Sequence, residues 1–152
     1  MNTIRIDPLQ PGETVLVLVD FVYPLDFDGA EAFAPSAWAA AQRSAALRER
    51  LSARGCRTVY ANDNYGRWTS EFKVLWRRCA RREGPAGRIA RALKPTPRDF
   101  AVLEPRHSAF YARLLDLLLK QLRYRRLVVT GIAASNCVLF TAMGAYLRDD
   151  SL

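Results

Sequence analysis

One cysteine stands where a strand gives way to a helix, a position that suits a nucleophile. Residues 127–129 form an apolar run, rich in β-branched side chains, that ends at Gly131 and is typical of a strand covered on both faces. Ser135 or Asn136 can cap the following helix, which places Cys137 in its first turn. There the partial positive charge of the helix end favours the nucleophilic thiolate, and nearby backbone amides could bind an oxyanion.

The same pattern has a second interpretation. Unpaired cysteines are often buried in the interior and chemically inert, so Cys137 could simply pack inside an ordinary strand–helix unit. A catalytic cysteine needs a base near its sulfur, so other segments of the chain would have to place such a residue beside Cys137.

Acidic residues end two other strands. The uninterrupted apolar run 15–19 indicates a central parallel strand that stops at Asp20, and the run 100–103 stops at Glu104. Asp20, Glu104 and Cys137 each stand at or just past the carboxyl end of a strand, so a parallel sheet would bring them to the same edge. Ligands of open parallel sheets bind at this edge. The alternative is that each is an ordinary polar residue closing its strand.

The elements that position these residues alternate along the chain. Strands are predicted over 15–19, 57–62, 100–103 and 127–131, separated by helices over 35–54, 71–82, 89–93 and around 114–119, with a last helix through Tyr146. Pro35 and Gly84-Pro85 are read as boundaries of helices. This alternation predicts an α/β fold, a three-layer sandwich around a parallel β-sheet, formed by a single domain over 1–152.

Composition narrows the class of protein. The chain has 152 residues and no apolar run long enough to span a membrane, and it begins without the pattern of a secretion signal. With three cysteines, too few for a disulfide framework, a reducing cytoplasm is the expected location. The net charge of +8 comes mainly from arginine. Its densest cluster, 77–82, fits the solvated side of a helix without a nucleic-acid-binding module, so no nucleic-acid partner is expected.

Several segments, in order along almost the whole chain, resemble the isochorismatase-like cysteine hydrolases, which include nicotinamidases and related amidohydrolases. The most specific of them is the run from Val129 to Ala142 around Cys137. The others are Val15–Asp20, Val59–Trp68, Arg106–Tyr111 and Leu114–Leu119.

The resemblance implies a catalytic triad of aspartate, lysine and cysteine, with Asp20 as the base and Cys137 as the nucleophile. It implies hydrolysis of small amides through a thioester, without a cofactor. It also implies a non-proline cis peptide at Ile132–Ala133, with the amides of Ala133 and Cys137 forming the oxyanion hole. By family habit, the protein would be a homo-oligomer.

Two positions depart from the family pattern. The triad lysine is expected at the end of the third strand, where this chain has Glu104, a carboxylate that would oppose formation of the Cys137 thiolate. Arg106 is the nearest candidate for a substitute cation. The sequence also stops at Leu152, where the family continues with another strand and helix, so those elements are expected to be lacking.

The remaining expectations concern the pocket and the role of the protein. Trp68, Tyr65 and Phe110 are candidates for walls of a substrate pocket, although aromatic residues more often form core. Some nicotinamidases, which this sequence resembles, bind a metal through an Asp-x-His motif and a second histidine. The equivalent loop here is Asn62-Asp63-Asn64 and the sole histidine is His107, so no metal site is expected. Two functions compete: a hydrolase of small C–N substrates, and a catalytically impaired member that binds a small molecule or a protein.

Overall fold

The protein is described here by a computed structural model covering residues 12–66, 71–104, 108–110 and 114–148. Within these residues, four parallel strands form one sheet in the order β3-β2-β1-β4. Their bounds are β1 (Thr14–Val19), β2 (Arg57–Asp63), β3 (Phe100–Glu104) and β4 (Arg126–Gly131). The predicted α/β class and the four strands are therefore confirmed.

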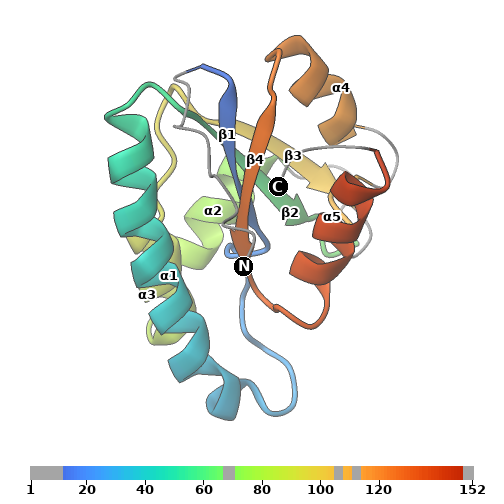
Figure 1. Ribbon diagram of the computed structural model, residues 1–152. Helices are drawn as coiled ribbons and strands as arrows, with labels where there is room; N and C mark the ends of the chain where they lie inside the picture. The colour runs from blue at the N-terminus through green and yellow to red at the C-terminus, as the bar shows by residue number, and fades with distance from the viewer. Residues whose placement is uncertain (1–11, 67–70, 105–107, 111–113, 149–152) are drawn as a thin grey trace, which may run out of the picture.

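Five helices in the described residues cover the two faces of this sheet (Figure 1). On one side lie α1 (Ala30–Ser52), α2 (Phe72–Ala80) and α3 (Pro85–Ala92), and on the other lie α4 (Leu114–Gln121) and α5 (Cys137–Tyr146). Strand β1 is buried along its whole length, as its unbroken apolar run predicts. Because side chains alternate along a strand, Leu16 and Leu18 pack into the core under α1 to α3, while Val15, Val17 and Val19 pack under α4 and α5.

Two helices begin earlier than the sequence predicts, and both differences involve proline. Helix α1 starts at Ala30 and runs through Pro35, so the residue read as its start lies inside it. Helix α3 starts at Pro85 rather than Ile89. Proline at the first helical position has no amide that needs a partner and has a suitable backbone angle; it therefore opens α3 instead of separating two elements.

The register of the strands brings their carboxyl ends together. Val19 is level with Ala61 of β2 and Gly131 of β4, and Asp63 is level with Glu104 of β3. The loop that leaves β1 and the turn that leaves β4 therefore start from neighbouring points at one edge. In Figure 1 both run at the lower end of the molecule.

Candidate functional site

Asp20 is the first residue after β1, and its carboxylate is held by the neighbouring strand. Its backbone has a φ of 51°, in the left-handed region that aspartate tolerates better than most residues. Its amide donates to the carbonyl of Ala61 at 2.9 Å, and its Oδ1 accepts from the amide of Asp63 at 2.7 Å. With a 9% exposed side chain, Asp20 is a buried, oriented carboxylate at the sheet edge.

The turn between β4 and α5 depends on a glycine. A Cβ on Gly131 would lie 2.3 Å from the carbonyl oxygen of Val19, so only glycine lets β4 end this close to β1. Shortly after Gly131, the peptide bond between Ile132 and Ala133 is cis, which confirms the cis bond expected from the family resemblance. The carbonyl of Ala133 then accepts the amides of Asn136 and Val138 at 3.1 and 3.2 Å, closing the turn that leads to Cys137.

Cys137 is the first residue of α5, as predicted, and Asn136 is the residue before it. Of the two capping candidates, Asn136 therefore occupies the N-cap position, but its side chain makes no capping hydrogen bond. Cys137 is partly exposed, whereas the other two cysteines, Cys56 and Cys79, are buried.

Asp20, after β1, and Cys137, after β4, lie together at the carboxyl ends of these two strands, and their side chains form a hydrogen bond. The Cys137 thiol is the donor and the carboxylate is the acceptor. Burial, this hydrogen bond and the negative charges of Asp20 and Asp63 together raise the pKa of Cys137 to about 12. Desolvation is the largest cause of the raised pKa, and a backbone hydrogen bond that lowers it is too weak to offset the rise, so the resting sulfur is a thiol hydrogen-bonded to a carboxylate.

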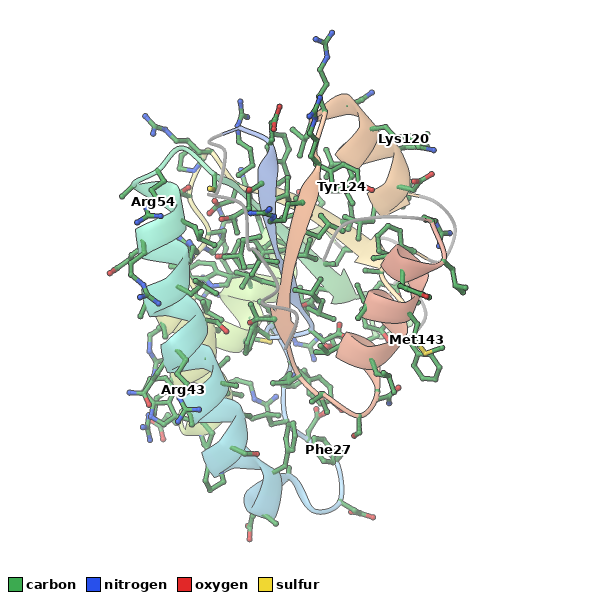
Figure 2. The ribbon with its side chains drawn as sticks, viewed as in Figure 1. Phe27, Arg43, Arg54, Lys120, Tyr124 and Met143 are labelled. Carbon is green, nitrogen blue, oxygen red and sulfur yellow. The ribbon has the colours of Figure 1, made fainter. Side chains whose placement is uncertain are left out.

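A cavity of about 440 Å³ opens in front of this pair, which is within the range of small-molecule sites. Figure 2 shows one of its residues, Phe27, on the loop between β1 and α1. The described residues that line the cavity are Asp20, Tyr23, Phe27, Phe33, Asp63, Tyr65, Ile132, Ala133, Asn136 and Cys137.

The residues expected as base, oxyanion-hole donor and nucleophile share this cavity: Asp20, Ala133 and Cys137. Tyr65, an expected wall, also lines it. Phe110 does not: it is 2% exposed and belongs to the core with Ala145, where its ring packs against Gly144. This position gives no support to the expected role of Phe110 in substrate binding.

The other expected residues lie wholly or partly outside the described part of the chain. Trp68, Arg106 and His107 fall in undescribed segments. Glu104 is described through its backbone, which ends β3 beside Asp63, but its side chain is not described.

Sequence reasoning missed much of the cavity wall. Tyr23 and Phe27 belong to an irregular loop, and Phe33 lies in the part of α1 that precedes Pro35. Asp63 was considered only in relation to a metal motif. Its position at the end of β2, one residue after Asn62 and at the same edge as Asp20, is a signal that could have identified it.

Two further properties of the described residues bear on the class of protein. They contain no helix with the length and apolar character needed to cross a bilayer. They also contain no group of three or more His, Cys, Asp or Glu side chains arranged to hold a metal ion.

Comparison with known proteins assigns the chain to a family. The sequence profile of the Isochorismatase domain matches residues 14–150. The chain belongs to the isochorismatase family. The isochorismatase family protein YaaI of Bacillus subtilis strain 168 is 31% identical over 144 residues, covering 95% of this chain and 78% of YaaI.

Solved structures of the family share the fold at low sequence identity. The N-carbamoylsarcosine amidase of Thermoplasma acidophilum superposes with a TM-score of 0.62 at 24% identity, covering 91% of this chain and 78% of the amidase. The nicotinamidase of Staphylococcus aureus superposes with a TM-score of 0.64 at 18% identity, covering 91% of this chain and 76% of the nicotinamidase. At these identities the likeness supports the fold alone.

Proposed function

We propose that this protein hydrolyses small amides or related C–N compounds, with Cys137 as the nucleophile and Asp20 as the general base. The observation that carries the proposal is the hydrogen bond between the two side chains at the floor of a ligand-sized cavity. A nucleophile and a base within hydrogen-bonding reach are the minimum machinery of acyl transfer. Family membership, with amidases among the structural relatives, points to the same reaction class.

In the first half of the reaction, the proton of the Cys137 thiol passes to Asp20 as the sulfur attacks the carbonyl carbon of the amide. The tetrahedral intermediate carries its negative charge on the former carbonyl oxygen. The proposed donors to that oxygen are the backbone amides of Ala133, in the turn after β4, and of Cys137, at the start of α5. The C–N bond then breaks, and Asp20 gives its proton to the departing nitrogen, which leaves as ammonia or an amine.

The second half regenerates the protein. Water attacks the thioester, and Asp20 accepts one of its protons. The C–S bond breaks, the carboxylic acid leaves, and the proton returns to the sulfur. The raised pKa of Cys137 fits a mechanism in which thiol deprotonation is concerted with attack, because a thiolate is scarce in the resting site.

That same raised pKa favours the competing function, an impaired member that binds a small molecule or a protein. The family's triad lysine would stabilise the thiolate, and this chain has Glu104 at the corresponding end of β3. Removing a cation and adding an anion both disfavour the charged sulfur. The two functions therefore differ in whether Asp20 alone suffices to activate Cys137.

Release of ammonia from a panel of small amides, including nicotinamide, tests the proposal. The parent, Cys137→Ala and the buried-cysteine control Cys56→Ala are compared. We expect turnover by the parent and the control but not by Cys137→Ala. Glu104→Lys separates the two functions: if only this variant turns over an amide that the parent binds, the parent is an impaired member.

A further inference from the structure

The cavity in front of Cys137 has an aromatic wall built from the loops that follow β1 and β2. The ring of Tyr23 stacks between two others. Its centroid lies 5.6 Å from Phe27 at an interplanar angle of 14°, and 5.0 Å from Tyr65 at 21°. Phe33 continues the wall, with its ring 5.8 Å from that of Phe27 and tilted by 60°. Such a wall favours flat ligands, and the electron-rich faces of aromatic rings attract cations.

The polar part of the lining is acidic. Asp20 and Asp63 both line the cavity, and none of its described lining residues is Lys, Arg or His. The backbone of Glu104 lies level with that of Asp63 on the adjacent strand, so three neighbouring strands end in acidic residues. The acidic lining contrasts with the net charge of +8 of the whole chain.

The Asp63 carboxylate is held in place by its own loop. Its Oδ1 accepts from the amide of Tyr65 at 2.7 Å, while the amide of Asp63 supports Asp20. One short segment thus positions a carboxylate, an aromatic ring and the proposed base.

The neighbouring titratable groups respond to this negative charge. Burial, followed by the charges of Asp26, Asp63 and Asp20, raises the pKa of the Tyr23 phenol. The same two cavity carboxylates contribute to the raised pKa of Cys137. Burial is the largest cause of both shifts, and the charges of the two cavity carboxylates add to it in both.

We propose that the cavity selects planar aromatic amides that carry a positive charge and rejects amides that carry a carboxylate. The inference rests on the proposed function for the position of the amide group, which must reach Cys137. The cationic end of the ligand would lie against the aromatic wall near Asp63. An anionic ligand would face Asp20 and Asp63 without a described cation to compensate.

Three benzamides that share one reactive group test this selectivity. 4-(Trimethylammonio)benzamide is the cation, 4-tert-butylbenzamide is its neutral isostere, and 4-carbamoylbenzoate is the anion. Binding is measured by calorimetry on Cys137→Ala, so that turnover does not interfere, and ammonia release is measured separately on the parent. We expect the cation to bind about tenfold more tightly than its isostere at low salt, and the anion to bind most weakly.

Asp63→Asn provides the matched variant, because asparagine keeps an oxygen that can accept from the Tyr65 amide but removes the charge. We expect it to reduce the cation preference about three- to tenfold. The control is Asp28→Asn, which removes the same charge from an exposed residue of the β1–α1 loop and should leave the preference unchanged. If Asp63→Asn folds poorly, the salt dependence of binding to Cys137→Ala replaces it. An electrostatic preference for the cation over its neutral isostere should weaken at high ionic strength.

Equal binding of the cation and its isostere, tightest binding of the anion, or binding of none of the three would overturn the inference. The result is separate from that of the hydrolase proposal. A clear cation preference without ammonia release would sink the hydrolase and leave the selectivity standing, while ammonia release without a preference would do the reverse.

Discussion

Replacing Asp20 by asparagine should make Cys137 more reactive toward an alkylating agent while abolishing hydrolysis. The prediction follows from the two opposing effects of Asp20. Its carboxylate accepts the thiol proton, which is what a base must do, but its charge and hydrogen bond also raise the pKa of Cys137. An asparagine at this position would keep the shape of the side chain and an oxygen that can accept a hydrogen bond, but it would remove the negative charge and could not take up the proton. Thiolate would therefore form more readily in a site that no longer has a base.

The magnitude follows from the pKa. With a pKa of about 12, about one Cys137 in ten thousand is ionised at pH 8, against about a quarter of an ordinary cysteine. The parent should therefore alkylate roughly a thousandfold more slowly than a free thiol, and its rate should keep rising with pH well above 9. Loss of a neighbouring charge shifts a pKa by about 1 to 3 units, so Asp20→Asn should label about 10- to 1000-fold faster at pH 8.

The assay is the rate of iodoacetamide labelling against pH, read by mass spectrometry on the peptide that contains Cys137. Cys56 and Cys79 are buried and serve as internal references for unfolding. Asp28→Asn controls for a change in overall charge. A parent Cys137 that labels like a free thiol at pH 8, or an Asp20→Asn variant that labels no faster than the parent, would refute the reasoning.

Three further predictions concern the supports of the site. Gly131→Ala should destabilise the fold by about 1–3 kcal/mol in urea unfolding, because the new Cβ would lie 2.3 Å from the Val19 carbonyl; an unchanged midpoint would contradict the close approach. Asn62→Ala should raise KM more than it lowers kcat, since Asn62 bonds both the amide and the carbonyl of Val22 and so anchors the loop bearing Tyr23; an unchanged KM would contradict this. Thr141→Val should cost about 1–2 kcal/mol, because the fully buried Thr141 hydroxyl accepts the Ala109 amide; equal stability in thermal unfolding would show that this bond is dispensable.

The elements predicted correctly from the sequence are those encoded by continuous runs of residues. The apolar run of β1 and the strand–glycine–cysteine order around β4 each determine local structure, and parallel pairing then brings Asp20 and Cys137 to one edge. The pairing needs no detailed packing, because the carboxyl ends of neighbouring parallel strands always meet.

The cavity wall could not be predicted in the same way. Tyr23 and Phe27 lie in an irregular loop whose path depends on tertiary hydrogen bonds, such as those of Asn62 with Val22. Phe110 shows the opposite case: its sequence neighbourhood resembles that of a site, whereas its side chain packs in the core against α5, a position that gives no support to the expected role. The two prolines misled for a related reason, since Pro35 and Pro85 are compatible with helix in their actual positions.

The central claim is that Cys137 forms a covalent bond with the substrate. The most direct measurement is peptide mass spectrometry of the protein quenched in acid during turnover of an amide. We predict an added acyl group on the peptide that contains Cys137, with its accumulation and decay matching product formation, and none in Cys137→Ala. The account would be contradicted if the parent turned over the amide without forming this adduct and Cys137→Ala kept the same turnover.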